Sequence, residues 1–219
     1  MSLYFLLLSI MVVLLYEGII SSLVYAPKKI KIISIIALIL MTFRYIALLI
    51  LFIMKNQNYL YLLKPFVYTN FIYIPMFGII SLFIFARNNR IKLKKILFMC
   101  TILVIAYCIG IYKSAANISI SNISGFTIEL QLKGYFYLGL LILNSIFIIK
   151  GIQLFNKTYS NKFGSLLIII SSIITLLSVL LTSINSDFVH LLLGDVCWII
   201  TINYGLIKFK KQKNKKTKK

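Results

Sequence analysis

Acidic side chains are scarce in this chain, which has four Asp and Glu against 24 Lys and Arg among 219 residues. The formal net charge is +20, and a surplus of this size is common in proteins that bind nucleic acids. The basic residues, however, lie in short segments between apolar runs and not on one folded face. We therefore expect the lipid bilayer, and no nucleic acid, as the partner of these charges.

Histidine and cysteine are also rare. The chain has one histidine, His190, and three cysteines, Cys100, Cys108 and Cys197. A zinc site or paired haem ligation needs more than one histidine and a cluster of ligands. The cysteines lie inside apolar runs without a Cys-x-x-Cys pair, so we expect them to be small buried hydrophobic residues. No Gly-rich phosphate loop occurs either, and the sequence predicts no metal site and no cofactor.

Hydrophobic residues are abundant, at 61% of the chain, which is more than a soluble domain buries in one core. A bilayer core about 30 Å thick is crossed by roughly 20 apolar residues of helix. Seven stretches of about this length occur, at residues 3–25, 32–54, 66–86, 96–112, 135–155, 164–184 and 188–207. The sequence thus predicts an all-α polytopic membrane protein. Residues 1–207 form a seven-transmembrane helix bundle and residues 208–219 a polybasic cytoplasmic tail.

The basic residues predict the orientation of this bundle, because cytoplasmic loops retain Lys and Arg during insertion. With the amino terminus outside, nineteen Lys and Arg fall in inner segments and four in outer loops, and Arg44 lies within a helix. We expect a multi-pass protein of the cell (plasma) membrane whose amino terminus is outside and whose carboxyl terminus is cytoplasmic.

The longest outer loop, residues 113–133, has a different pattern. Apolar residues alternate with polar ones around Ile118 and again around Ile128, which is the period of a β-strand. Asn122 to Gly125 supply turn chemistry between the two runs. We predict a small extracellular β-hairpin between helices 4 and 5, which is either a lid over a ligand or a passive cover over the helix ends.

Charged residues inside the predicted spans are the first candidates for function, because an unpaired charge in hydrocarbon is costly. By a rise of 1.5 Å per residue, Arg44 and Asp195 each lie about 18 Å from the cytoplasmic ends of their helices, and Glu17 about 12 Å. We predict a buried Arg–carboxylate cluster of Glu17, Arg44 and Asp195. It is either a ligand-binding or proton-linked switch, or a structural pairing that fixes helix packing.

Aromatic and polar residues near this depth extend the candidate site. Tyr68, Asn70 and Tyr73 lie in the outer part of the third span, Asn144 lies in the fifth and Trp198 follows Asp195 by one turn. Together they are candidates for an outward-facing pocket with aromatic walls. The alternative is that the aromatic rings mark the membrane interface and the amides join neighbouring helices.

An enzymatic alternative rests on His190 and Cys197, seven residues apart on one helical face. A histidine and a cysteine form a base and a nucleophile in some enzymes, and this spacing resembles that of membrane peptidases that process bacterial quorum-sensing propeptides. About 10 Å of helix rise separates the two residues, which is too far for a direct hydrogen bond. We expect no catalytic residues, and rank a peptidase third among the functions.

The predicted tail is rich in lysine. Such a segment attracts anionic lipids, and docking of an acidic cytosolic partner is the alternative. Its lysines are Lys208, Lys210, Lys211, Lys213, Lys215, Lys216, Lys218 and Lys219.

The pattern as a whole resembles the seven-transmembrane sensor region at the amino terminus of bacterial histidine kinases. The resemblance rests on the outside start, a third helix from Phe66 to Arg90 with a central Ile74-Pro75 and a basic exit, a longer segment after helix four and a polar last hairpin. It implies detection of a membrane or extracellular cue and its relay to a cytoplasmic catalytic domain.

The chain stops twelve residues after the last predicted helix and contains no kinase domain. From the sequence we therefore predict a non-enzymatic sensor or regulatory input module. It binds a small or hydrophobic ligand and acts through a partner such as a cytoplasmic kinase or another output protein. The alternative is a small transport, export or immunity subunit of a membrane complex.

Overall fold

The computed structural model describes residues 2–54, 59–86, 93–121, 125–184 and 192–217. Most of these residues are helical, and two short strands form the only sheet within the described ranges. The elements in chain order are α1 (Ser2–Tyr25), α2 (Lys28–Ile53), the 3-10 helix η1 (Leu60–Leu63), α3 (Lys64–Val67), α4 (Asn70–Ala86), α5 (Leu93–Lys113), β1 (Ala116–Ser121), β2 (Gly125–Leu130), α6 (Lys133–Phe155), α7 (Lys162–Ile184) and α8 (Leu192–Thr217).

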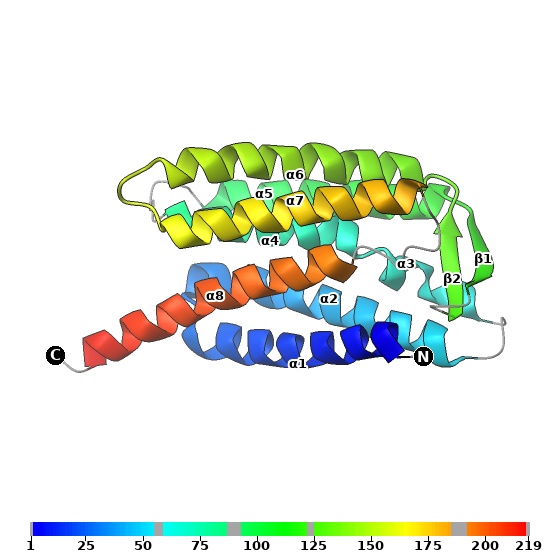
Figure 1. Ribbon diagram of the computed structural model, residues 1–219, viewed down its shortest axis with the longest axis horizontal. Coiled ribbons are helices and arrows are strands. Elements are labelled where there is room, and N and C mark those ends of the chain that lie inside the picture. The colour runs from blue at the N-terminus through cyan, green and yellow to red at the C-terminus, as the bar shows by residue number, and fades with distance from the viewer. Residues whose placement is uncertain (1, 55–58, 87–92, 122–124, 185–191, 218–219) are drawn as a thin grey trace.

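The long helices lie roughly along one axis and form a bundle (Figure 1). In this view α6, α7, α5 and α4 make the upper part, and α8, α2 and α1 the lower part. The strands lie at one end of the bundle, close to the start of α1, and the last turns of α8 project beyond the opposite end. The two chain ends therefore lie toward opposite ends of the bundle.

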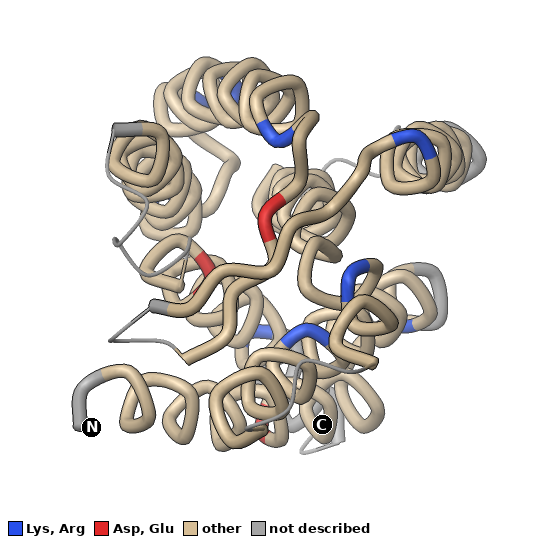
Figure 2. The backbone as a smooth tube through the Cα atoms, turned by 90° about the vertical axis from the view of Figure 1, so that its right-hand side faces the viewer, with Lys and Arg blue, Asp and Glu red and all other residues tan. Residues whose placement is uncertain are grey.

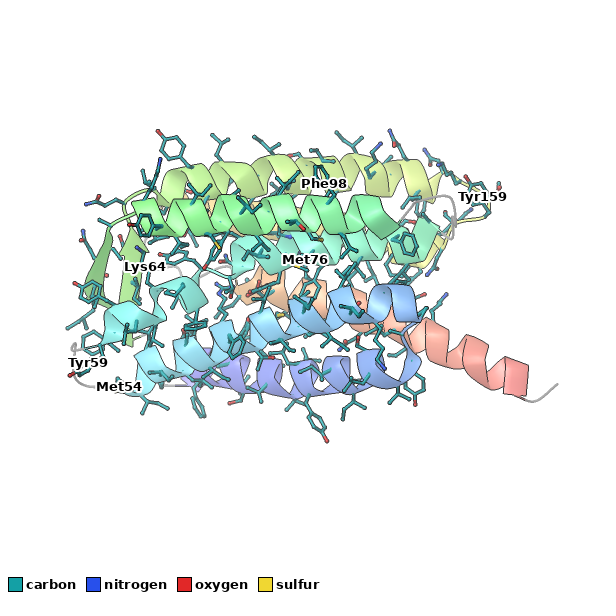
Figure 3. The ribbon with its side chains drawn as sticks, turned by 180° about the vertical axis from the view of Figure 1, so that it is seen from behind. Met54, Tyr59, Lys64, Met76, Phe98 and Tyr159 are labelled. Carbon is teal, nitrogen blue, oxygen red and sulfur yellow. The ribbon has the colours of Figure 1, made fainter. Side chains whose placement is uncertain are left out.

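Five segments among the described residues are long and apolar enough to cross a membrane. They are Tyr4–Tyr25, Ile30–Ile53, Leu60–Ala86, Lys133–Phe155 and Lys162–Ser183. Many large apolar side chains on these helices point outward, as the view from behind shows (Figure 3). A soluble monomer rarely exposes contiguous apolar surface of this kind, so the helices indicate a membrane location.

The other two predicted spans differ from this group. The apolar part of α5, Leu97–Lys113, rises about 25 Å and is shorter than a typical hydrocarbon core. Helix α8 is not among the five segments, and its predicted start at residues 188–191 lies outside the described residues. Each predicted range overlaps a helix, but the number of spans stays a prediction. The tight turn expected at residues 185–187 also lies outside the described part.

Two helix boundaries differ from the predicted ones. The third predicted span is interrupted at Tyr68 and Thr69, where the chain forms a turn between α3 and α4. Helix α8 continues to Thr217 and does not end at residue 207. Lys and Gln are good helix formers, so the basic sequence after residue 207 prolongs the helix although it is no longer apolar.

Strands β1 and β2 pair antiparallel, with Ile118 opposite Ile128 and Asn117 opposite Glu129. Ile128 and Leu130 are buried against the helix ends, whereas Ile120, on the same face of the ladder but next to its tip, is exposed. The tip at residues 122–124 lies outside the described residues. Figure 2 looks onto this end of the bundle and shows the ladder crossing the helix ends. Its extracellular location stays a prediction.

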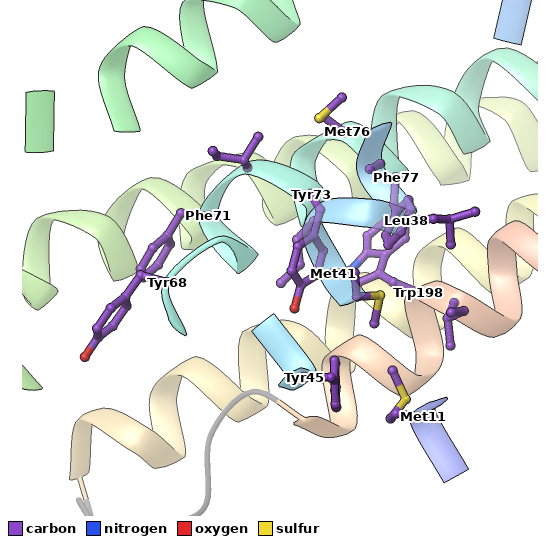
Figure 4. Packing of buried hydrophobic residues seen from close by; sticks show 14 of the residues in the cluster. Met11, Leu38, Met41, Tyr45, Tyr68, Phe71, Tyr73, Met76, Phe77 and Trp198 are labelled. Atoms are coloured by element: carbon purple, nitrogen blue, oxygen red, sulfur yellow. The ribbon is translucent and has the colours of Figure 1, made fainter. Parts of the chain in front are cut away.

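The interior is built from apolar side chains of α1, α2, α4, α6 and α8 (Figure 4). At its centre Trp198 and Phe77 are fully buried. Close packing at the contact of α4 with α6 depends on Gly78, where a Cβ atom would lie 2.2 Å from the ring of Phe147. That ring is itself held edge-on against Trp198, with centroids 5.8 Å apart. Residue 78 must therefore lack a side chain for α4 and α6 to approach in this way.

We expect Gly78→Ala to destabilise the protein because the added methyl group overpacks the contact, at a typical cost of about 1–3 kcal/mol. Gly139→Ala in α6 is the matched control, since a Cβ atom there meets nothing within 4 Å. Both changes remove a helix-interior glycine, which by itself favours the helix by about 1 kcal/mol. Thermal unfolding in detergent should place Gly78→Ala below wild type and Gly139→Ala at or above it. Equal melting temperatures for the two variants would contradict the packing.

Candidate functional site

Arg44 of α2 and Asp195 of α8 form an ion pair in the interior of the bundle. Arg44 Nη1 donates a hydrogen bond to Asp195 Oδ2. The exposed fraction is 3% for Arg44 and 0% for Asp195. The two residues are 151 positions apart in the sequence, so this contact joins the first part of the chain to the last helix.

Two tyrosines complete the site. The Tyr73 hydroxyl, from α4, accepts a hydrogen bond from Arg44 Nη1 at 2.6 Å and donates one to Asp195 Oδ2 at 2.7 Å. The Tyr45 hydroxyl donates to the same Oδ2 atom at 3.1 Å. We call Arg44, Tyr45, Tyr73 and Asp195 the buried charge cluster. It joins α2, α4 and α8 by polar contacts within an apolar core. Figure 4 shows Tyr45 and Tyr73 among the apolar side chains of this core.

The sequence around each residue explains how the cluster forms. Asp195 lies in the first turn of α8, where the positive end of the helix dipole favours a carboxylate. Arg44 lies well inside the apolar helix α2, so its side chain must find an acceptor within the protein. The two phenols supply further donors to the carboxylate, and a buried ion pair is stable only when such hydrogen bonds accompany it.

The hydrogen bonds of the cluster are distributed unevenly. All the donors named above converge on Asp195 Oδ2, whereas Asp195 Oδ1 and Arg44 Nε have no hydrogen-bond partner among the described residues. An unpartnered buried polar atom is unfavourable. The hydrogen bonds of the cluster therefore hold Asp195 through one of its two carboxylate oxygens and leave the other without a partner among the described residues.

Glu17 does not belong to this cluster, and the prediction that it does is wrong. Its side chain is exposed on the outer face of α1. The neighbouring Gly18 turns inward instead, where a Cβ atom would lie 2.8 Å from Asn203 Oδ1 and 3.2 Å from a methyl carbon of Leu38. Successive helical residues differ by about 100° in direction, so a helix that packs Gly18 inward directs Glu17 outward. The estimate from helix rise gave the depth of Glu17 in the membrane but not the direction in which its side chain points.

The remaining predicted site residues have separate partners. The Tyr68 hydroxyl donates to the Ile128 carbonyl oxygen of β2 at 2.5 Å. Trp198 Nε1 donates to Thr175 Oγ1 of α7 at 3.0 Å. Asn70 is buried at the start of α4, and Asn144 Nδ2 donates to the Leu140 carbonyl oxygen within α6. Tyr68 and Trp198 therefore join separate elements, and none of these four side chains is hydrogen-bonded to Arg44.

A pocket does exist, at a place that the sequence did not reveal. It has a volume of about 350 Å³ and lies between α5 and α6, with Phe71 of α4 at its inner wall. Its lining is apolar and contains the small residues Ala106, Gly110 and Gly139. A Cβ atom at Gly139 would meet nothing within 4 Å, whereas one at Gly110 would lie 2.4 Å from the Phe136 ring. The other lining residues are Leu103, Tyr107, Leu132, Tyr135, Phe136, Leu140 and Leu143. The only signal in the sequence was the presence of glycines within two apolar helices. Local periodicity does not show whether such glycines border a pocket or allow two helices to pack closely.

The pocket contacts the residues next to the buried charge cluster. The Phe71 ring stacks on Phe136 with centroids 4.7 Å apart, and on Tyr68 at 5.9 Å. Phe71 precedes Tyr73 by two residues on α4. Residues two apart on a helix point in nearly opposite directions, so the first turn of α4 presents Phe71 to the pocket and Tyr73 to Arg44 and Asp195.

Two predicted features lie partly outside the described part of the chain. His190 is in the segment 185–191, and Cys197 is partly buried in α8, so the spacing of a His–Cys pair has no structural description. In the polybasic segment, Lys208 lies over the Tyr204 ring, with Nζ 5.2 Å from its centroid. The backbone stays helical through Lys210, Lys211, Lys213, Lys215 and Lys216, and Lys218 and Lys219 are beyond it.

Replacement of one member of the ion pair should destabilise the protein more than replacement of both. Arg44→Leu and Asp195→Leu each leave a buried charge without its partner, which typically costs about 3–5 kcal/mol. The double variant removes both charges and should recover a large part of that loss. Thermal unfolding of the four proteins in detergent gives the coupling between the two residues directly. Additive losses, or an unchanged melting profile for Arg44→Leu, would contradict the pairing.

Comparison with known proteins adds no assignment to this geometry. No protein-family model matches the chain, and no curated protein matches it significantly. The site itself must therefore carry the functional conclusion.

Proposed function

We propose that this protein is a membrane sensor or regulatory input module that binds an apolar ligand between α5 and α6 and responds through the buried charge cluster. The observation that carries this proposal is the connection through α4. Phe71 forms a wall of the pocket, and Tyr73, two residues later, bonds both members of the ion pair.

The pocket favours a linear apolar ligand. Its volume of about 350 Å³ lies near the lower end of the range of ligand pockets, roughly 300–1,000 Å³. The Tyr107 hydroxyl already donates to the Pro65 carbonyl oxygen, which leaves few polar groups to hold a polar ligand. Leu103, Leu140 and Leu143 are suited to contact an alkyl chain. The pocket lies between helices whose outer faces are apolar, so a lipid-soluble compound would reach it from the bilayer.

The response would begin at Phe71. A ligand that displaces the Phe136 ring changes the stack on Phe71 and the position of the first turn of α4. Tyr73 then changes its hydrogen bonds to Arg44 and Asp195, and α8 moves relative to α2. A ligand shifts such an equilibrium only by its difference in affinity for the two states. The unpartnered Asp195 Oδ1 supports this model, since it offers the carboxylate a second acceptor position.

The hairpin is connected to the same path. The Tyr68 hydroxyl bonds β2, and the Tyr68 ring stacks on Phe71 with an angle of 3° between the rings. An extracellular cue that moves the hairpin would therefore act on the same turn of α4. This arrangement supports the role proposed from the resemblance to kinase sensor regions, with relay to a separate cytoplasmic output protein. A transport, export or immunity subunit remains the alternative proposal.

The proposed topology has seven spans, with the amino terminus and hairpin outside and the basic end of α8 inside. Several observations support it. The chain ends lie toward opposite ends of the bundle, and the hairpin lies at the same end as the start of α1 (Figure 1). The turn at Ala26 and Pro27, the loop with Lys157 and the basic part of α8 lie at the other end. From an outside amino terminus, each of these three segments follows an odd number of proposed crossings and therefore lies on the inner side. This agrees with the distribution of basic residues.

Cysteine labelling of intact cells tests this topology. In a background with the native cysteines replaced by alanine, Asn117→Cys should react with a membrane-impermeant maleimide. Lys157→Cys should react only after the cells are opened. Both side chains are exposed, so a difference in labelling between the two cysteines reports the side of the membrane on which each lies. Labelling of Lys157→Cys in sealed cells, or of both positions together, would overturn the proposed orientation.

Filling the pocket should abolish binding of an alkyl ligand. The probe is a linear alkyl alcohol with a diazirine at its end, added to protein in phosphatidylcholine nanodiscs. Gly139→Leu places a side chain in the pocket. We expect it to lower the labelling of α5 and α6 about tenfold, which corresponds to a loss of about 1.4 kcal/mol of binding free energy. Gly134→Leu is the matched control, because a Cβ atom there also meets open space but Gly134 does not line the pocket. Equal labelling of the two variants would contradict the site.

The chain's single tryptophan, Trp198, reports the response. It lies one turn from Asp195 and is fully buried, so movement of α8 should change its emission. We expect the probe to shift the emission of wild type and not of Gly139→Leu. Tyr73→Phe should keep the probe labelling and lose the emission shift, because it removes the hydroxyl that joins α4 to the ion pair. An emission shift that persists in Tyr73→Phe would contradict the proposed path.

A further inference from the structure

A lysine lies next to the apolar pocket between α5 and α6. Lys64, the first residue of α3, is at the end of the bundle where the hairpin lies (Figure 3). Its ammonium donates a hydrogen bond to the carbonyl oxygen of Ser114, the residue that follows α5. Ser114 Oγ accepts a hydrogen bond from the Leu132 backbone N–H at 3.2 Å, and Leu132 lines the pocket. One residue, Ser114, therefore connects the ammonium to the pocket lining.

The residue after Lys64 is bonded to another wall of the pocket. The Pro65 carbonyl oxygen accepts a hydrogen bond from the Tyr107 hydroxyl, and Tyr107 of α5 lines the pocket. Two consecutive residues of α3 thus contact the α5 side of the site. These two bonds fix the start of α3, and with it the Lys64 ammonium, beside the pocket.

The ammonium is at one end of the pocket. On α5 the lining runs from Leu103 to Gly110, and the carbonyl oxygen that accepts from Lys64 lies about one turn beyond Gly110. On α6 the lining runs from Leu132, at the start of the helix, to Leu143, which is about 16 Å of helix rise. The pocket therefore has a charged end beside the hairpin and an apolar end at Leu103 and Leu143.

The charge of Lys64 has no counter-ion within the described part of the chain. At this end of the bundle the ion pair among the described residues joins Lys133 to Glu129. Lys64 is partly buried, and a charge withdrawn from water is unfavourable unless it is paired. An ammonium has three donors, and the hydrogen bond to the carbonyl oxygen uses one of them. Lys64 can therefore still bind an anion.

The surrounding charges favour an anion at this position. Residues 60–67 and 113–133 contain three lysines, Lys64, Lys113 and Lys133, and one acidic residue, Glu129. Because Glu129 is already paired with Lys133, the two other lysines leave this end positive. A positive potential beside an apolar pocket attracts ligands that have a negative group and an apolar part.

We propose that the ligand of this pocket is an amphiphile with an anionic head group, which pairs with Lys64 while its alkyl chain extends to Leu103 and Leu143. This inference rests on the proposed function, in which the pocket binds an alkyl chain, and adds the charge of the ligand and its direction. The charged oxygens of the head group accept hydrogen bonds from the ammonium, and such charge-assisted bonds are strong. A free alkyl acid and an anionic lipid of the bilayer both have this chemistry.

A comparison of two head groups tests the proposal. The probes are a linear alkyl sulfonate and an alkyl alcohol of equal length, each with a diazirine at the end opposite its head group. They are added at equal mole fraction to the full chain in phosphatidylcholine nanodiscs. We expect the sulfonate to label wild type about tenfold more than the alcohol, because it gains a hydrogen bond to a charged group. Equal labelling by the two probes would overturn the inference.

The position of the label tests the direction of the ligand. With the head group at Lys64, the diazirine of the sulfonate reaches the apolar end of the pocket and should label α5 and α6 near Leu103 and Leu143. Peptide mapping by mass spectrometry locates the label. Labelling by the sulfonate near Leu132 would place the head group at the wrong end and contradict the pairing.

Substitution of the lysine separates its charge from its packing. Lys64→Gln should lose the preference for the sulfonate and keep its labelling by the alcohol, which shows that the pocket is intact. Lys64→Arg keeps the charge and should keep the preference. Lys113→Gln is the matched control, since Lys113 is exposed at the same end of the bundle. An equal loss of preference in Lys113→Gln and Lys64→Gln would assign the effect to net charge and refute the role of Lys64.

The inference and the proposed function fail in different ways. If neither probe labels the pocket, both are wrong. If the alcohol labels it and the sulfonate has no advantage, the pocket remains the ligand site and only the anionic head group is excluded. Addition of phosphatidylglycerol distinguishes the two sources of the head group. It should lower labelling by the sulfonate if the natural ligand is a bilayer lipid, and leave it unchanged if the ligand is a free alkyl acid; both results agree with an anionic head group.

Discussion

The ion pair between Arg44 and Asp195 is the contact on which the rest of the structure depends, because neither charge is tolerated alone in this interior. Arg44 is fixed in α2 and Asp195 in the first turn of α8, so their pairing determines how the last helix packs against the first hairpin of helices. Tyr73 adds α4 to the same contact. Apolar packing around the cluster is non-directional, whereas these hydrogen bonds have fixed geometry. The cluster therefore specifies one arrangement among the many that apolar helices allow.

In the proposed function, the same cluster is the part of the bundle that changes. Its donors converge on one carboxylate oxygen while the other has no partner among the described residues, so a small movement of α4 or α8 offers an alternative set of bonds. The apolar pocket lies beside the start of α4, and the hairpin is tied to the turn that precedes it. A signal from the bilayer and a signal from the hairpin end would meet at Tyr73. The ion pair can thus have both a structural and a proposed functional role. Because it holds α8 against α2, a change in its hydrogen bonds would alter how these helices pack.

The outer surface has a different function from the core. Most of it is suited to acyl chains, since large apolar side chains cover the helices (Figure 3). Glu17 is the exception on α1, and its exposure follows from the close approach of Gly18 to α8. Charged side chains of the described helices therefore occur in two settings. Arg44 and Asp195 are paired inside the bundle, and Glu17 lies on its outer surface.

The sequence by itself determined the class of the protein. Long apolar runs, alternating residues between positions 113 and 133 and the depth of Arg44 and Asp195 follow from composition and local periodicity, which act within a few turns of one element. Only the tertiary structure decided which faces meet. It placed Tyr45 in the cluster, directed Glu17 away from it, separated Tyr68 and Trp198 into other contacts and opened the pocket beside Gly139. The reason is that helix rotation and spacing are set by packing against neighbours distant in sequence. In a nearly uniformly apolar helix, periodicity gives no indication of that rotation.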